Sequence, residues 1–192
     1  MPRTRRSKLG TRHSRRGFTL IEAALTTVIV GTGVLAIISA QQAYHRKNQW
    51  AVQSGTGLLL ANEVRERMLG LPTHDPLSGS SNLGPESDED GPAAFDDIDD
   101  FAGAIDAGGF GAGTTFDPPI NALGESIPDM AGWSQHVEVL SVLPDRMNVT
   151  AALAQPLGST DLFRVTVTTS YDPPGPAGPE VISELTWVMG RQ

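Results

Sequence analysis

Residues 18–40 read FTLIEAALTTVIVGTGVLAIISA, and this apolar run decides how the rest of the chain has to be arranged. It contains a single charged residue, Glu22, and no proline. As a helix it would be about 34 Å long, which is enough to cross a bilayer core of about 30 Å. Its threonine and serine hydroxyls can donate to carbonyls one turn earlier, so lipid tolerates them. We therefore expect a membrane-spanning helix over residues 18–40.

Charge is divided unevenly along the chain. The first 17 residues carry seven of the 14 Lys and Arg and none of the 22 acidic residues. A basic segment in front of an apolar run is typical of the cytoplasmic side of a membrane. A basic arm could instead bind nucleic acid, but the apolar run follows it directly and the rest of the chain is acidic, so no nucleic-acid partner is predicted. The chain has no cysteine, which excludes disulfides, thiolate metal sites and a cysteine nucleophile.

The apolar run itself allows three interpretations. The first is a plain single-pass anchor. The second is a secretory signal peptide cleaved at Ala40, although Ile38 stands where a small residue is needed and Glu22 lies inside the apolar core of such a peptide. The third interpretation accounts for Glu22 and depends on the residues that join the basic segment to the run.

Those joining residues, 15–22, read RRGFTLIE. They resemble the cleavage and methylation motif of type IV prepilins and type II secretion pseudopilins, in which a basic leader ends in Gly and is followed by Phe, Thr, Leu, another apolar residue, Glu and an apolar helix. The resemblance covers residues 1 to about 70 and is strongest to a minor pilin of the PilV kind or a minor pseudopilin. The paired cysteines and the helix proline of many major pilins are absent, which favours a minor subunit.

The resemblance implies a maturation pathway. A prepilin peptidase would cut after Gly17, where the missing side chain allows close approach to the scissile bond, and Phe18 would become the N-methylated first residue. Glu22 would act in assembly by pairing with the N-terminus of a neighbouring subunit, because a carboxylate in hydrocarbon needs a partner. The implied partners are the peptidase, other pilin or pseudopilin subunits, an inner-membrane assembly platform and membrane lipid. The implied location is the inner membrane, with the leader cytoplasmic and the head extracytoplasmic, and then the pilus or pseudopilus.

Beyond the membrane the helix is expected to continue over residues 41–70. This stretch lacks proline, and the apolar residues of its second half include spacings of four, which is typical of an amphipathic helix. Gly70 before Pro72 predicts its end, whereas Gly55 and Gly57 are expected weak points.

The rest of the chain is expected to form a head of α+β fold, in which the long helix packs on a small antiparallel sheet. Alternating and branched residues predict three strands, at residues 133–143, 162–171 and 181–189. The acidic, Gly- and Pro-rich region before them is either an ordered excursion or partly disordered. The ordered alternative would pack through Phe95, Ile98, Phe101, Phe110 and Phe116. The expected organisation is a leader (1–17), a transmembrane half-helix (18–40), an amphipathic half-helix (41–70), an acidic loop region (71–132) and a β head (133–192).

Two acidic groups in the loop region are candidates for calcium. The first has the spacing of positions 1, 3, 5, 6 and 12 of a calcium loop, at Glu86, Asp88, Asp90, Gly91 and Asp97. Its first and last positions depart from the pattern, and no flanking helices are evident. The second group is Asp96, Asp97, Asp99 and Asp100. Acidic loops are usually just solvated, so we predict no cofactor and no metal ligand, with weak calcium binding left open.

Catalysis has little support in the sequence. The four histidines, His13, His45, His74 and His136, are scattered and follow no metal-ligand spacing. The glycine-rich run at residues 108–113 predicts a turn, since the only lysines, at positions 8 and 47, rule out a P-loop. We therefore expect a structural subunit, not an enzyme. The alternative is an uncleaved, membrane-anchored binding module with an acidic, calcium-binding head, and an exported enzyme is the third class.

Overall fold

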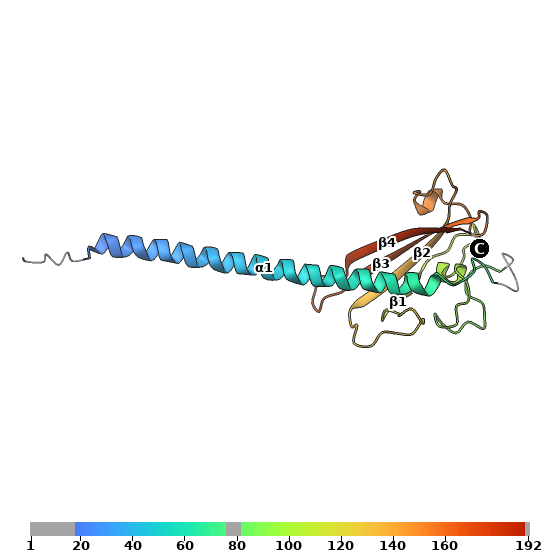
Figure 1. Cartoon of the computed structure of the whole chain (residues 1–192), viewed down its shortest axis with the longest axis horizontal. Coiled ribbons are helices and arrows are strands. Elements are labelled where there is room, and N and C mark those ends of the chain that lie inside the picture. Colours follow the sequence, from blue (N-terminus) through green and yellow to red (C-terminus); the bar gives the residue numbers. More distant parts are fainter. Residues whose placement is uncertain (1–17, 76–81, 191–192) are drawn as a thin grey trace, which may run out of the picture. The chain divides into compact units, whose positions relative to one another are not determined.

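The computed structural model describes residues 18–75 and 82–190 of the chain. They divide into two units at Asn48 and Gln49, a boundary that falls within helix α1 (Leu20–Met68), which Figure 1 shows. The backbone N–H of Glu22 donates to the carbonyl of Thr19 (3.0 Å) and to its hydroxyl (3.4 Å). Thr19 is thus the N-terminal cap of α1, a position that favours threonine. The helix ends two residues before Gly70, as the sequence predicts.

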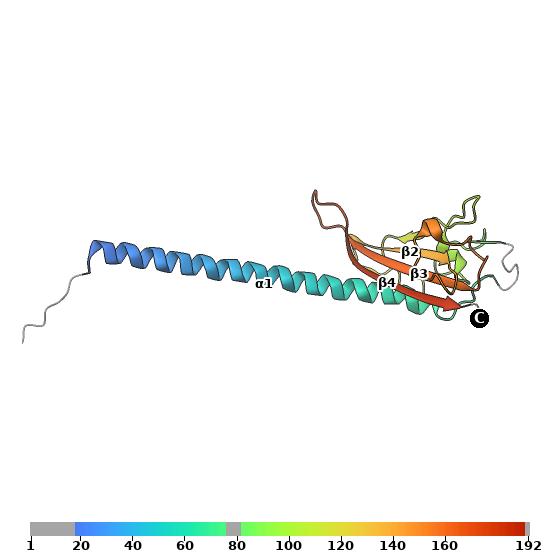
Figure 2. The same ribbon diagram turned by 90° about the horizontal axis from the view of Figure 1, so that it is seen from above.

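The second unit contains a four-stranded antiparallel sheet in the order β1-β2-β3-β4. Its strands are β1 (Thr114–Phe116), β2 (Trp133–Ser141), β3 (Leu162–Tyr171) and β4 (Glu180–Gly190). The three long strands lie side by side in Figure 2, and they confirm the three sequence-predicted strands to within two residues. Strand β1 was not predicted, because three residues are too short to show an alternating pattern.

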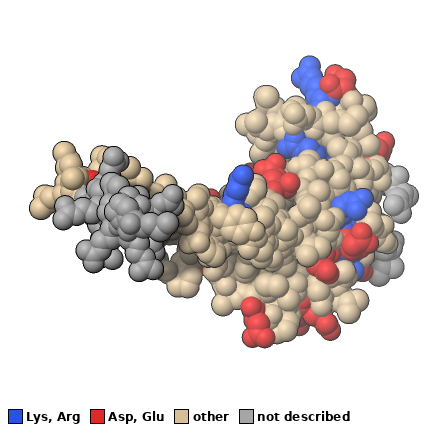
Figure 3. All heavy atoms as spheres, turned by 60° about the vertical axis from the view of Figure 1, so that its left-hand side comes forward, with Lys and Arg blue, Asp and Glu red and all other residues tan. Residues whose placement is uncertain are grey.

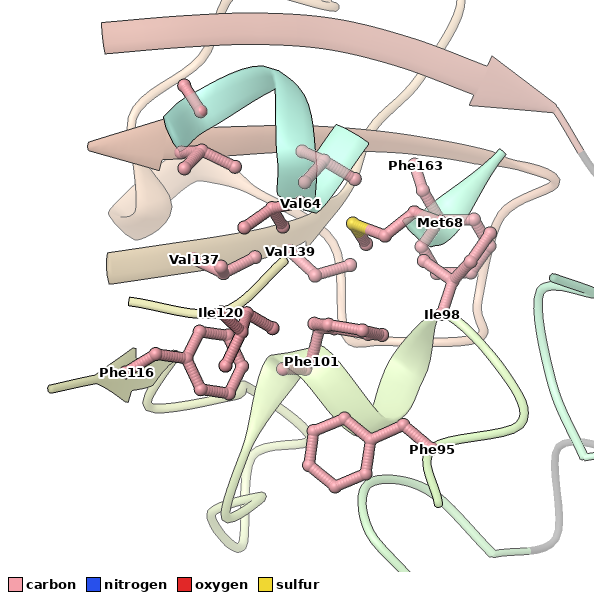
Figure 4. Packing of buried hydrophobic residues seen from close by; sticks show 14 of the residues in the cluster. Val64, Met68, Phe95, Ile98, Phe101, Phe116, Ile120, Val137, Val139 and Phe163 are labelled. Atoms are coloured by element: carbon pink, nitrogen blue, oxygen red, sulfur yellow. The ribbon is translucent and has the colours of Figure 1, made fainter. Parts of the chain in front are cut away.

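One face of this sheet packs against the last turns of α1, so the α+β fold predicted from the sequence is confirmed. Ala61, Val64 and Met68 of α1 are fully buried, together with Phe163 and Val165 of β3. Figure 4 shows Val64 and Met68 directed toward the sheet residues. Burying one such aliphatic side chain stabilises the fold by about 1.5–3 kcal/mol.

The loop region closes the other side of this core. Phe95, Ile98, Phe101 and Phe116 join the same cluster, and the Phe101 ring meets those of Phe95 and Phe116 edge to face, with centroids 5.1 and 6.2 Å apart (Figure 4). Phe110 is half-buried beside a second, smaller cluster. The described residues 82–132 thus pack against this core through these side chains. This region also contains a short 3-10 helix, η2 (Asp99–Ala102), and a second one, η3 (Ala151–Leu153), follows β2.

Two details fix how α1 meets the sheet. A Cβ placed on Gly57 would lie 2.8 Å from Thr169 Oγ1 and 3.0 Å from the Ile182 side chain, so only glycine permits this approach. The buried amide of Gln135 donates to the carbonyls of Leu60 (2.7 Å) and Ile120 (3.1 Å) and accepts the Ile120 N–H (2.7 Å). Gln135 on β2 thus joins the helix, the sheet and the loop region.

Candidate functional site

The first candidate site is the apolar segment of α1. Helix α1 is long and apolar enough to cross a membrane, and none of its most apolar 18 residues is buried within the structure. The predicted hydroxyl bonds are present: Thr26 donates to the Glu22 carbonyl (2.7 Å) and Ser39 to the Leu35 carbonyl (2.9 Å). The hydroxyls of the segment are therefore satisfied within the helix itself, which suits a lipid environment.

Of the motif residues, Gly17 and the basic leader lie outside the described residues. Phe18 is 72% exposed and stands directly before the cap residue Thr19. Glu22 lies in the first turn of α1 with its side chain exposed. Its carboxylate has no hydrogen bond or ion pair with another described residue.

The second candidate site is an acidic cluster in the loop region, formed by residues between positions 86 and 100. Two sets of carboxylate oxygens are close together, and within each set the oxygens lie within 4.8 Å of one another. One set comes from Glu86, Glu89 and Asp100 and the other from Asp96, Asp97 and Asp100. Asp97, Asp99 and Asp100 are almost completely buried. The two sequence candidates are therefore partly merged through Asp100. Asp88, Asp90 and Gly91 belong to neither set, and Glu89, which the sequence did not single out, belongs to one.

Backbone hydrogen bonds hold these carboxylates in place. Asp97 Oδ1 accepts the Asp100 N–H, and Asp100 Oδ2 accepts the Asp97 N–H, each at 3.1 Å, as in a capping box at the start of a helical turn. Glu89 joins two segments, because its Oε2 accepts the Glu86 N–H (2.9 Å) and its Oε1 accepts the Asp96 N–H (3.0 Å). The positions of the side chains thus follow from local turns, not from a regular spacing in the sequence.

Asp99 has a separate role. Its Oδ1 lies 3.1 Å from Nδ1 of the buried His74, and its Oδ2 accepts the Gly84 N–H at 3.2 Å. The His74 ring also meets the Phe163 ring edge to face. Asp99 therefore links the start of the loop region to the core, and its oxygens are engaged by these two donors.

The crowding of carboxylates changes their proton affinities. Burial raises the pKa of Asp97 to about 9 and the pKa of Asp100 to about 8. Burial also raises the pKa of Asp99 to about 6. The pKa values of Glu86 and Asp96 are raised as well, first by burial and then by the neighbouring Glu89. In each case the charged form is disfavoured, because there is too little water or positive charge to stabilise it.

A cavity of about 180 Å³ opens beside the cluster. Its lining consists of Asp75, Glu86, Asp88, Glu89, Ala94 and Asp96. Almost every side chain around it is acidic, so the cavity can accept a small cation or water but would repel an anion. Acidic side chains are also spread over the visible face in Figure 3, without gathering into one patch.

The remaining sequence candidates lie apart from this cluster. His136 on β2 bonds to the Thr115 hydroxyl (2.9 Å), and His45 lies on α1. His13 lies outside the described residues. The glycine-rich run contains the predicted turn, where Asp106 accepts the N–H groups of Gly108 and Phe110.

A groove of about 540 Å³ also lies over the sheet. Its lining includes His136, Glu138 and Arg164 together with threonines of β3 and β4.

Comparisons of the chain with protein-family models, with curated proteins and with solved structures gave no match to any of them.

Proposed function

We propose that the chain is a minor pilin-like or pseudopilin-like subunit, matured by a prepilin peptidase and assembled through its N-terminal helix. The observation that carries the proposal is the exposed apolar stretch of α1, which begins within the RRGFTLIE segment, directly after Gly17. Leu20, Ile21 and Leu25 are 90%, 77% and 62% exposed. Such a surface is stable only in lipid or against other apolar helices.

The apolar segment of α1 can move from surrounding lipid into a bundle of apolar helices. Lipid tails and leucine side chains are similarly apolar, so helices associate in membranes by close packing, and small residues favour it. A Cβ on Gly31 or Gly33 would meet nothing within 4 Å, so both positions are free for a neighbouring helix. A subunit can therefore wait in the membrane and later join a bundle of identical or related helices.

Glu22 gives this assembly a register. On insertion scales a charged side chain such as aspartate costs about 2.5–3.5 kcal/mol at the centre of a membrane helix, and a positive partner lowers the cost of burying the Glu22 carboxylate in the same apolar run. In the proposed filament the partner is the N-terminal amine that cleavage creates on a neighbouring subunit. One charge in the apolar run then selects one axial position between neighbouring helices.

The maturation step is tested by the mass of the N-terminal peptide from protein extracted from membranes of the native host. The expected peptide begins with N-methylated Phe18. Gly17→Val should leave the leader attached, because a branched side chain blocks close approach at the scissile bond. Gly10→Val changes a glycine of the same leader away from the motif and should be processed normally. A wild-type protein that retains Met1, or that starts near Gln41, would refute the proposal.

The assembly step is tested with Glu22→Gln, which keeps the shape of the side chain and removes its charge. Chemical crosslinking in membranes should show fewer subunit contacts for this variant, with normal cleavage. Glu66→Gln is the matched control, because Glu66 is an exposed glutamate in the last turns of the same helix. Equal crosslinking of the two variants would contradict the role of Glu22.

The acidic cluster favours a second candidate, an uncleaved membrane-anchored module whose head binds cations. This function requires Met1 to be retained and Glu22→Gln to have no effect on association. The two experiments above therefore separate the two functions.

A further inference from the structure

One buried oxygen in the acidic cluster lacks a donor. The Asp100 side chain is 0% exposed, and its Oδ2 accepts the N–H groups of Asp96 and Asp97, both at 3.1 Å. Its Oδ1 is buried and has no hydrogen-bond partner among the described residues. Buried polar atoms in native proteins are almost always satisfied, and an unpaired one frequently marks the place of a water molecule or an ion.

The surroundings of Asp100 favour an ion over a water molecule at this place. A carboxylate oxygen of Asp100 lies within 4.8 Å of oxygens from Glu86 and Glu89, which both line the cavity of about 180 Å³. Ca²⁺ binds oxygen at about 2.3–2.6 Å, so two ligands of one ion lie up to about 5 Å apart. The three oxygens therefore have the spacing of ligands around a single ion.

In the described part of the chain, no positive side chain neutralises the carboxylates of Glu86, Glu89 and Asp100. The guanidinium of Arg67 is directed to the carbonyls of Ala93 and Phe95, and His74 is engaged with Asp99. No salt bridge joins Glu86, Glu89 or Asp100 to a described Lys, Arg or His. Three clustered carboxylates without a counter-charge are repulsive, and a divalent cation removes that repulsion.

We propose that Glu86, Glu89 and Asp100 bind a Ca²⁺ ion beside this cavity. Water and the nearby Asp96 or Asp88 can complete the coordination from the open side. An all-oxygen set on irregular loops suits calcium, which accepts six to eight ligands in flexible geometry, whereas Mg²⁺ demands a near-ideal octahedron. Zinc and copper prefer nitrogen or sulfur ligands, and neither is offered by these three side chains. The site does not depend on the proposed assembly function.

This site differs from the calcium-loop spacing read from the sequence. That spacing uses Asp90 and omits Glu89 and Asp100, whereas the structure leaves Asp90 exposed and outside both carboxylate sets. Asp90→Asn and Asp100→Asn therefore separate the two arrangements. Both replace a carboxylic acid side chain with an amide in the same loop region.

The test is calcium titration of the full chain in detergent micelles, after removal of divalent cations with a chelator. CaCl₂ alone is added up to about 10 mM, above the dissociation constants of about 10⁻⁴–10⁻³ M seen for extracellular calcium modules. Isothermal calorimetry should show one site. The midpoint of thermal unfolding should rise by about 5–10 °C at a calcium concentration one hundred times Kd.

The variants decide which residues bind. Asp100→Asn should raise Kd at least about tenfold, and Glu86→Gln should raise it similarly. Because Asp100 is buried, Glu86→Gln serves as the second variant for the case in which Asp100→Asn disturbs folding. Without calcium, Asp100→Asn should unfold no earlier than the wild type, because the amide oxygen can still accept the Asp96 and Asp97 N–H groups and no repulsive carboxylate is introduced. Asp90→Asn should bind as the wild type does. Absence of binding by the wild type, equal stabilisation by MgCl₂, or unchanged affinity in both Asp100→Asn and Glu86→Gln would overturn the proposal.

Discussion

Alanine at Gly57 should destabilise the head, whereas alanine at Gly55 should stabilise it. Both glycines lie within α1, two positions apart. A Cβ at Gly55 meets nothing within 4 Å, while a Cβ at Gly57 would lie 2.8 Å from Thr169 Oγ1 and 3.1 Å from Ser183 Oγ. The two substitutions are thus chemically identical and differ only in what lies across from them.

The magnitudes follow from this difference. Alanine is favoured over glycine in a helix by about 0.8–1.0 kcal/mol, and this gain is common to both variants. At Gly57 the added methyl overpacks a filled interface, which costs about 1–3 kcal/mol. It also displaces the Thr169 hydroxyl, which lies 2.7 Å from the Ser183 hydroxyl, at a further cost of about 1 kcal/mol. We expect Gly57→Ala to lose about 1–3 kcal/mol and the two variants to differ by about 2–4 kcal/mol.

Urea unfolding of the full chain in mild detergent, followed by tryptophan fluorescence, measures this difference. Trp133 and Trp187 lie in β2 and β4, so their emission reports on the head. The helix-propensity gain is common to both variants and cancels in the difference between them. Equal stability of Gly55→Ala and Gly57→Ala would refute the reasoning that glycine allows α1 to touch β3 and β4.

Two further substitutions test the packing of the core and the hydrogen bonds of the buried Gln135 amide. Phe101→Ala should lower the free energy of unfolding by about 3–5 kcal/mol, because it empties a fully buried ring site between Phe95 and Phe116; a loss below about 1 kcal/mol in urea unfolding would contradict this packing. Gln135→Leu should lower it by about 2–4 kcal/mol and speed hydrogen exchange at the Ile120 amide, because that N–H loses its buried acceptor. Unchanged hydrogen exchange at the Ile120 amide would argue against its hydrogen bond to Gln135.

Much of the fold could be predicted because the long elements have strong local signals. The apolar run and the Gly70–Pro72 stop define α1, and regular alternation defines β2, β3 and β4. Gly55 and Gly57, in contrast, have the same local signal and both looked like weak points. Only Gly57 faces the sheet, and its neighbour Thr169 lies more than a hundred residues later in the chain. No local pattern could distinguish the two.

The acidic cluster was predictable in composition but not in pairing. Acidic runs marked residues 86–100 as a cation candidate, yet the spacing rule selected Asp88 and Asp90, which lie outside the two carboxylate sets. Glu89 meets Asp100 because the chain folds back between them, held by burial of Phe95 and Phe101. That fold-back depends on the shape of the core, so a linear motif does not encode it.

The order of the strands has a consequence for the time at which the head can form. Every sheet pairing joins strands that follow one another in the chain, so hairpins can close quickly once their residues are available. The core, however, needs α1 from the start of the chain and β3 from near the end. Ribosomes make the N-terminus first. The side chains of Phe95, Phe101 and Phe116 therefore cannot be buried against the sheet until residues 133–190 have been made. The many acidic side chains interspersed among these aromatics would keep that waiting segment hydrated and hinder premature association.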